Sequence, residues 1–258
     1  MIKKMSIALA AAAFALTAGL ATADEKLRIG VEGAYPPFSE KTADGKLIGF
    51  DIDIAMALCA EMKRDCELVE QDWDGMIPGL MAKKYDAIIA SMSITAERMK
   101  KIDFSKKYYN TPGKLAAKKG MFADDQPATL KGKIIGVQRA TIHADFVNAI
   151  YGEMSEIREY GTQEEVYLDL TAGRLDAIAA DALAINDGFL KTANGKGYAF
   201  FGVDHNEKKF FGDGAGVGVR KGDTALRDSF SKAIAALRAN GTYTKLNDKY
   251  FDIDIFGK

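Results

Sequence analysis

The sequence predicts a two-lobed α/β protein. Two short apolar segments far apart in the chain are nearly alike, residues 85–90 (YDAIIA) and 175–180 (LDAIAA), and each follows a helix-like run and a basic residue. Predicted strands and helices alternate throughout, and the alternation starts twice, near Leu27 and near Lys133. Alternation favours parallel sheets covered by helices, and the two starts favour two lobes. The alternative reading of the repeat is a chance recurrence in two core strands.

The repeat also predicts where a ligand binds. In open α/β sheets, ligands lie just beyond the carboxyl ends of the strands. Polar side chains stand at these ends, because Ser91 and Ser93 follow the first repeated strand and Asp181 follows the second. We therefore expect a binding cleft between the two α/β units.

The elements of the first half follow from periodicity and caps. Residues 27–31 form the first predicted strand, and a loop with two prolines follows it. A helix begins at Phe50, because apolar residues recur from there at helical spacing. The other predicted elements before residue 110 are a strand at 66–69, a short helix at 73–82, the repeated strand at 85–90 and a polar turn capped by Thr95.

The second half restarts the pattern with a strand at 134–137 and a helix that Thr141 caps and that reaches Tyr151. A strongly amphipathic helix at 223–238 ends at an Asn-Gly pair. The final helices have no sheet of their own, so we expect them to pack on the first lobe. The chain must then pass between the lobes twice. The other predicted elements are strands at 157–160, 175–180 and 216–219 and helices at 164–172 and 183–190.

The N-terminus is typical of a secretion signal, residues 1–23. Lys3 and Lys4 precede an uncharged apolar run at 7–20, and small residues at 21–23 form a cleavage site. The run is short for a bilayer span, and a membrane anchor is the alternative. Without the signal, the formal net charge of −1 becomes −3. This near-neutral balance, with no basic block, does not point to nucleic acid or to a membrane surface.

Cys59 and Cys66 are the only cysteines in the sequence. Oxidising compartments allow a disulfide, so export favours a bond between them, with a pair of buried thiols as the alternative. Two cysteines without nearby histidines are too few for a metal site, and a Cys-x-x-Cys redox motif is absent. We expect no metal and no cofactor. The sequence shows no recognisable Ser/His/Asp catalytic triad.

Several motifs together resemble one family, the bacterial periplasmic solute-binding proteins for polar amino acids. The matching segments are 27–30 (LRIG), 35–38 (YPPF), 49–54 (GFDIDI), 211–214 (FGDG), 216–221 (GVGVRK) and 241–243 (GTY). The likeness covers essentially the whole mature chain and is strongest to the lysine/arginine/ornithine-binding branch, which also has a cysteine pair at this place. The resemblance implies the type II periplasmic-binding-protein fold, two α/β lobes joined by a two-segment hinge.

An amino-acid pocket needs a cation for the α-carboxylate and an anion for the α-ammonium. Arg98 is the candidate cation, because a planar guanidinium can form hydrogen bonds to both oxygens of a carboxylate. It also matches the family's carboxylate-binding arginine. From spacing alone, Arg98 reads as a solvated helix residue beside Lys100 and Lys101. Asp181 matches the residue that takes the α-ammonium, and it is also placed to cap the helix near 183.

Four further positions match ligand contacts of the family. Ser91 and Ser93 offer hydroxyl and backbone groups, and Ala90 stands where some members have another serine. Thr141 and His143 lie where a helix opens, whose N–H groups favour a carboxylate.

The turn before that helix, residues 138–142 (QRATI), departs from the Gly-, Ser- and Thr-rich turn of the relatives. Ile142 has only its backbone to offer. The role of the Arg139 side chain is open, and exposure to solvent is the simple reading. For His143, the residue pattern favours a partly exposed helix position, and a ligand contact at the pocket rim is the alternative.

The residues for the ligand's distal end point to a cationic side chain. Tyr35 and Trp73 match the two aromatic walls of the family's pocket, and tryptophan is the best face for a cation. Core packing is the alternative for Trp73. Glu32 stands where relatives have an acid at the distal end, and its alternative is an exposed loop position. An acid between aromatic walls selects an ammonium or guanidinium tip.

The combined interpretation is a monomeric periplasmic binding protein that closes on one basic L-amino acid (arginine, ornithine or lysine) and delivers it to an ABC permease. The expected boundaries are lobe 1 at 24–110 and 211–258, lobe 2 at 113–206, and hinges at 110–113 and 208–211. Three rivals remain: a binder of histidine or of opines such as octopine, a cyclohexadienyl dehydratase-like enzyme on the same fold, and a sensor subunit. We expect binding and not turnover.

Overall fold

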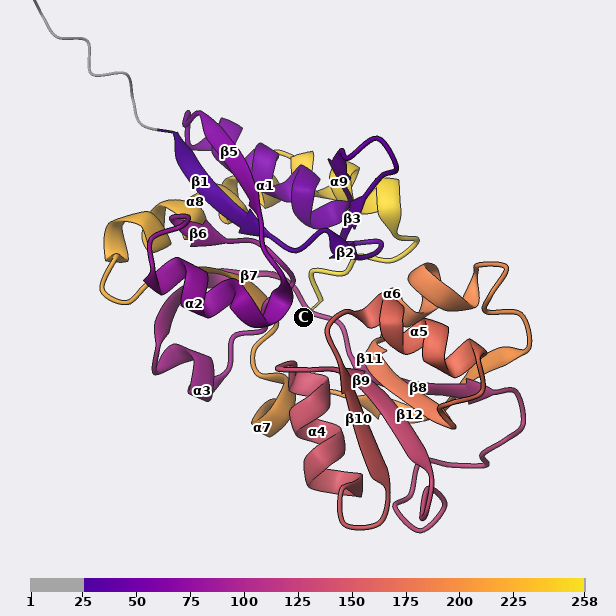
Figure 1. Ribbon diagram of the computed structural model, residues 1–258. Coiled ribbons are helices and arrows are strands. Elements are labelled where there is room, and N and C mark those ends of the chain that lie inside the picture. The colour runs from indigo at the N-terminus through magenta and orange to yellow at the C-terminus, as the bar shows by residue number, and fades with distance from the viewer. Residues whose placement is uncertain (1–25, 258) are drawn as a thin grey trace, which may run out of the picture.

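The computed structural model describes residues 26–257 and shows two α/β lobes connected by crossing segments (Figure 1). The expected signal sequence at 1–23 lies outside these residues. Each lobe is built on a sheet of five strands, and a third, small sheet of three strands lies in the first lobe. Within residues 26–257, no helix has the length and apolarity to cross a membrane.

The first sheet has the strand order β5-β1-β6-β13-β7. Strand β1 pairs in parallel with β5 and β6, and β13 pairs antiparallel with β6 and β7. One face is covered by α1, α8 and α9 and the other by α2, and each face has its own buried apolar cluster. The strands are β1 Leu27–Val31, β5 Cys66–Glu70, β6 Ala87–Ile88, β7 Ile102–Tyr109 and β13 Ala215–Arg220.

The second sheet repeats this design in the order β10-β9-β11-β8-β12. Strand β9 pairs in parallel with β10 and β11, whereas β8 pairs antiparallel with β11 and β12. Helix α4 covers one face and α5 with α6 covers the other. The strands are β8 Gly113–Lys118, β9 Ile134–Gln138, β10 Glu156–Tyr160, β11 Ala177–Asp181 and β12 Tyr198–His205.

The helices lie close to where their caps and periodicity predict them. Helix α1 begins at Phe50, Thr141 caps α4, and the amphipathic helix α8 ends next to Asn240. Both final helices pack on the first lobe, as expected. The bounds are α1 Phe50–Glu61, the 3₁₀ turn Trp73–Gly75, α2 Met76–Met81, α3 Ala96–Met99, α4 Ile142–Tyr151, α5 Gln163–Thr171, α6 Ala182–Ile185, the π-helical turn Asn186–Leu190, α7 Lys208–Phe211, α8 Thr224–Ala239 and α9 Thr242–Tyr250.

The expectation of parallel sheets was wrong, because both sheets are mixed. One strand of each sheet, β13 in the first and β8 in the second, runs opposite to the other four. Strands β7, β8 and β12 are not among the elements that the sequence pattern predicted. These strands carry the chain to and from the crossings, so their direction is set by connectivity between lobes. The expected loop after β1 also contains a small sheet of β2 Ala34–Tyr35, β3 Ser39–Lys41 and β4 Leu47–Ile48.

The chain passes between the lobes twice. The first crossing lies between β7 and β8, at residues 110–112. The expected second hinge, 208–211, is instead helix α7, which packs on α4 and buries Phe211 in the second lobe. The return crossing follows at 212–214, where Gly212 has a φ of 70° and a Cβ would lie 2.1 Å from the carbonyl oxygen of Ile94. Hinge motion at these segments stays a prediction.

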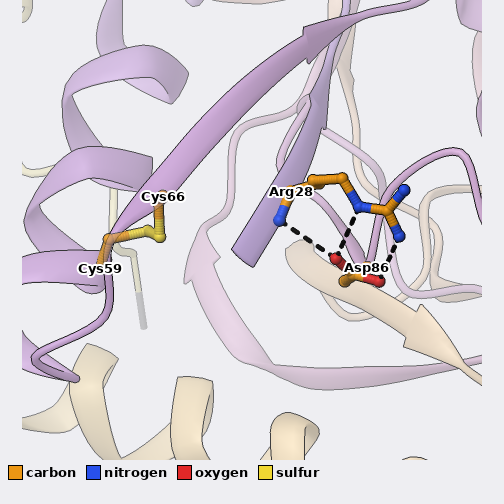
Figure 2. The surroundings of a disulfide bond; sticks show 4 residues. All are labelled: Arg28, Cys59, Cys66 and Asp86. Carbon is orange, nitrogen blue, oxygen red and sulfur yellow. Dashed lines mark hydrogen bonds and ion pairs between the residues drawn. A yellow bond between two sulfur atoms is a disulfide. The ribbon is translucent and has the colours of Figure 1, made fainter. Parts of the chain in front are cut away.

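Cys59 and Cys66 form a disulfide with their Cα atoms 6.2 Å apart, which confirms the bond over a pair of buried thiols (Figure 2). The bond joins the last turn of α1 to the first residue of β5. Nearby, the Arg28 backbone N–H and guanidinium both donate to Asp86, which ties β1 to the turn before β6 (Figure 2). The disulfide therefore holds the edge strand β5 to α1, and the ion pair holds together two inner strands of the first sheet.

Candidate ligand-binding cleft

A cavity lies between the lobes, at the carboxyl ends of β1, β6, β9 and β11. All nine predicted site residues line it. Its lining is Glu32, Tyr35, Trp73, Ala90, Ser91, Ser93, Arg98, Tyr109, Asn110, Thr111, Gln138, Thr141, Ile142, His143, Asp181, Phe211, Gly214 and Ala215. The fold therefore brings the predicted residues together, while their roles toward a ligand stay a prediction.

Arg98 is a cation at the cavity wall that takes part in no ion pair among residues 26–257. It lies on the short helix α3, which Thr95 caps as predicted. Its Nη1 donates to the carbonyl oxygen of Ser93 (3.1 Å) and its Nη2 to that of Ala140 (3.4 Å). A guanidinium has five N–H donors, so others remain for a carboxylate. Burial lowers the pKa of Arg98 to about 10, which leaves it charged at neutral pH.

Asp181 combines the two roles considered for it. Its Oδ1 accepts from the backbone N–H groups of Leu183 (2.8 Å) and Ala184 (3.3 Å), so it caps α6. Its Oδ2 accepts from the hydroxyl of Thr111 at the first crossing. Burial raises the pKa of Asp181 to about 6, against the opposing effect of these hydrogen bonds. The carboxylate is therefore a buried anion on the cavity wall of the second lobe.

Glu32 is buried, with 6 % of its surface exposed, and is not the exposed loop residue of the alternative reading. Its Oε1 accepts a hydrogen bond of 2.6 Å from Nε2 of Gln138, which belongs to the other lobe. Burial raises the pKa of Glu32 to about 7, and the nearby Asp51 and Asp72 raise it further. No ion pair satisfies Glu32 within residues 26–257, so a cation in the cavity would relieve this unfavourable burial.

Asp51 is a residue that the sequence reasoning did not assign to the site. It is buried beneath the cavity and accepts hydrogen bonds from the hydroxyls of Ser91 (2.8 Å) and Tyr108 (2.9 Å). Ser91 has a φ of 54°, in the left-handed region, and its backbone N–H donates to Tyr108. Asp51 thus orients Ser91. Its place inside the segment GFDIDI was the available signal.

The two aromatic residues are fixed by polar contacts that cross the cleft. The Tyr35 hydroxyl accepts from the backbone N–H of Asp181 (3.3 Å), and Trp73 Nε1 donates to the carbonyl oxygen of Ala140 (3.1 Å). The Arg98 guanidinium carbon lies 5.2 Å from the Trp73 ring centroid. Trp73 also packs in the apolar cluster under α2. The core reading and the wall reading of Trp73 are therefore compatible.

Helix α4 directs its N-terminus at the cavity. Thr141 caps it by accepting from the N–H of Ala144 (3.0 Å), and Ile142 and His143 follow on the cavity wall. The first N–H groups of a helix have no intrahelical acceptor, and the helix dipole favours an anion there. His143 is buried and not partly exposed as expected, and burial together with Arg98 lowers its pKa to about 3. Its neutral ring adds no charge.

Arg139 does not simply face solvent. Its Nε lies 2.6 Å from Oδ2 of Asp74 in the first lobe. Both side chains are partly exposed, at 48 % and 39 %. The departure of this turn from the family pattern therefore has a structural consequence, an ion pair between the lobes.

Other lining residues were not predicted as parts of the site. Tyr109 is the last residue of β7, Asn110 and Thr111 lie in the first crossing, and Phe211 belongs to α7. Neither β7 nor α7 was predicted. Gln138 is the last residue of β9 and is buried. Its position after an apolar strand was a usable signal, since ligands bind at the carboxyl ends of strands.

Two lobes meet around a cavity that carries Arg98 and Glu32 from the first lobe and Asp181 from the second. This arrangement is that of a protein that encloses a small polar molecule. The chain belongs to family 3 of the bacterial extracellular solute-binding proteins, which matches residues 27–253. This confirms the predicted family and the two-lobed α/β fold.

Relatives of known name match nearly the whole chain. The L-arginine-binding protein of Pseudomonas aeruginosa is 49% identical over 256 residues, with 99% of both chains covered. The lysine/arginine/ornithine-binding periplasmic protein of Escherichia coli is 43% identical, with 95% of this chain and 97% of that chain covered. A solved structure of a Salmonella typhimurium periplasmic binding protein described for its high arginine specificity matches with a TM-score of 0.80 and 32% identity, covering 88% of this chain and 99% of that one.

Proposed function

We propose that this protein captures a basic L-amino acid (arginine, ornithine or lysine) in the periplasm and delivers it to the membrane permease of an ABC importer. The observation that carries the proposal is the charge balance of the cavity. Glu32 and Asp181 are two buried acids on its wall, whereas Arg98 is the one cationic side chain on it among the described residues. A ligand with one net positive charge neutralises this set, and a neutral amino acid does not.

The proposed pose uses each charge once. The α-carboxylate lies between Arg98 and the N-terminus of α4, where the guanidinium and the backbone N–H groups both favour an anion. The α-ammonium contacts Asp181, and the cationic tip reaches Glu32 between the aromatic residues Tyr35 and Trp73. Ser91 and Ser93 supply further polar contacts. Hydrogen bonds to charged groups each contribute ~1.5–3 kcal/mol, which suffices for a micromolar to nanomolar binder, ~8–12 kcal/mol.

The pose explains why the ligand favours closure. Arg98 and Glu32 belong to the first lobe, whereas Asp181 and α4 belong to the second. A ligand shifts a conformational equilibrium only by its differential affinity for the two states. Contacts to both lobes form only when the lobes meet, so a basic amino acid stabilises the closed form that the permease would receive. The names of the relatives support this class of ligand.

Calorimetric titration tests the ligand class. L-arginine, L-ornithine and L-lysine should bind, and L-citrulline, which has the shape of arginine without its charge, should bind much more weakly. Preference for citrulline or glutamine over all three basic amino acids would refute the proposal. L-histidine and octopine belong in the same series, because a tighter complex with either would reassign the ligand within the family.

Turnover is not part of the proposed function. The named relatives are binding proteins, and a dehydratase on this fold would act on prephenate or arogenate. Incubation of the protein with each compound, followed by chromatography of the products, tests this point. Formation of phenylpyruvate or phenylalanine above a protein-free control would show that the protein is an enzyme. A sensor role is tested separately by deleting the gene and comparing amino-acid uptake with transcription.

A further inference from the structure

Three successive residues, the last of β9 and the two that follow it, each make a contact across the cleft. Gln138 donates to Glu32 (2.6 Å), Arg139 pairs with Asp74 (2.6 Å), and the carbonyl oxygen of Ala140 accepts from Trp73 (3.1 Å) and Arg98 (3.4 Å). We call residues 138–140 the interlobe turn. Its partners in the first lobe include the tip acid, an aromatic wall and the carboxylate-binding arginine of the proposed pose.

The backbone of the interlobe turn is shaped for these contacts. Ala140 has a φ of 57°, a left-handed conformation that a residue with a Cβ adopts at a cost. The Arg139 backbone N–H is held by the carbonyl oxygen of Tyr160 (2.9 Å), and the second amide hydrogen bond of Gln138 goes to the carbonyl oxygen of Gly161 (3.2 Å). The turn is thus anchored within its own lobe while its side chains and one carbonyl reach the other.

Arg139 differs from its two neighbours because it acts outside the cavity. Gln138 lines the cavity wall, but neither Arg139 nor Asp74 does. The ion pair lies at the partly exposed edge of the cleft, with the negative charges of Asp72 and Glu165 also near the guanidinium. The ion pair therefore connects the two lobes, but it lies outside the cavity and does not contact a ligand bound there.

We propose that the interlobe turn is a clasp that stabilises the closed form, and that Arg139 sets how long a bound ligand stays although it does not contact the ligand. The inference rests on the proposed function, in which ligand release requires the lobes to part. A contact that exists only in the closed form slows opening, and it does so equally for every ligand that the closed form encloses.

The test is the release rate of L-arginine from wild-type protein, Arg139→Ala and Asp74→Asn. Trp73 is the only tryptophan of the chain and lies under the interlobe turn, so stopped-flow fluorescence reports opening without a label. An exposed ion pair is worth a small free energy, which predicts a release rate about 1.5- to 5-fold faster in either variant. The association rate should change little, and L-lysine and L-ornithine should show the same factor.

Three comparisons separate the clasp from a merely structural effect. The double variant Arg139→Ala/Asp74→Asn should release no faster than the single variants. Raising the salt concentration should speed release from wild type and leave Arg139→Ala less affected, because salt screens exposed pairs. The matched control is Lys41→Ala, which breaks an ion pair of the same length (2.6 Å) and similar exposure (46 % and 43 %) inside the first lobe. This control should release at the wild-type rate.

The clasp would be refuted if Arg139→Ala released L-arginine at the wild-type rate. It would also be refuted if Lys41→Ala released L-arginine as fast as Arg139→Ala does. Failure of wild-type protein to bind any of L-arginine, L-lysine and L-ornithine would refute the proposed function instead. In that event, acrylamide quenching of Trp73 in the ligand-free proteins decides the inference. Stronger quenching in Arg139→Ala than in wild type and Lys41→Ala supports the clasp, and equal quenching in all three refutes it.

Discussion

The strand orders β5-β1-β6-β13-β7 and β10-β9-β11-β8-β12 place equivalent strands side by side in the two lobes. In each sheet the fourth strand in this order runs opposite to the other four, which are parallel to one another. The segments after equivalent strands differ, however. The connection from β1 to α1 contains a small sheet and buries Glu32, whereas β9 reaches α4 through a short turn. The same framework thus presents a side-chain carboxylate in one lobe and a helix N-terminus in the other.

The ends of the third parallel strands differ in charge. After β6 come Ser91, Ser93 and the cation Arg98, whereas β11 ends in the anion Asp181. Each lobe alone therefore offers an incomplete site for a zwitterion. In the proposed pose, the charges that bind the zwitterion are thus divided between two lobes of one design, so that recognition requires both lobes.

The largest expected effect comes from removing either half of this charge pair. Arg98→Ala and Asp181→Asn should each weaken L-arginine about 100-fold or more, because each removes charge-assisted hydrogen bonds of ~1.5–3 kcal/mol apiece. Calorimetry measures the loss. Asn keeps the helix cap that Ala would remove, so thermal unfolding of Asp181→Asn should match wild type. Near-normal affinity in either variant would break the proposed division of charge.

The next effect separates the ligand's tip from its α-amino-acid part. Glu32→Gln should weaken L-arginine about 10- to 100-fold, the effect of one or two charge-assisted hydrogen bonds, and should leave L-citrulline nearly unchanged. Competition calorimetry gives both constants. An equal loss for both ligands would contradict the assignment of Glu32 to the cationic tip.

The buried acids also predict a pH dependence. Burial raises the pKa of Glu32 to about 7 and that of Asp181 to about 6, and a bound cation favours their ionised forms. Affinity for L-arginine should therefore fall as pH drops from 8 to 5, by up to about tenfold per pH unit for each group that protonates. Titrations in buffers of different ionisation enthalpy should detect proton release on binding. Affinity that rises toward low pH would refute this linkage.

The same groups affect the ligand-free protein in the opposite direction. Because their folded pKa values lie above the unfolded ones, the folded state holds more protons from about pH 4 to pH 7. Their contribution to stability is present at low pH and is lost as pH rises through the folded pKa. Glu32→Gln should flatten this slope in a pH series of urea unfolding. If the free energy of unfolding changed with pH in the same way in Glu32→Gln and wild type, Glu32 would not contribute to this pH dependence.

The smallest effect on affinity is expected from removing the disulfide. This bond stabilises the first lobe, and the second lobe has no equivalent. It closes the joint between α1 and β5, and the equivalent joint between α4 and β10 has none. Cys59→Ser/Cys66→Ser should lower the free energy of unfolding by ~2–3 kcal/mol in the chain-entropy model. Denaturant titration measures this loss, and the dissociation constant for L-arginine should not change. A large loss of affinity would show that the disulfide edge shapes the cavity.

Much of the fold was predictable because its signals are local. Thr95, Thr141 and Asp181 cap helices where the sequence places cap residues, and α1 begins at the predicted Phe50. Strands β7, β8 and β12 were missed because they are set by pairing with distant strands. Helix α7 was taken for a hinge because its packing on α4 involves residues far apart in the chain.

The sequence by itself determined the helices and their caps, the repeated strands and the identities of the charged groups near the strand ends. Tertiary structure alone decided which of these groups meet across the cleft, such as Gln138 with Glu32 and Arg139 with Asp74. It also decided the shifted pKa values, since these arise from burial. The physical reason is that caps and periodicity depend on neighbours in the chain, whereas desolvation and contacts between lobes depend on neighbours in space.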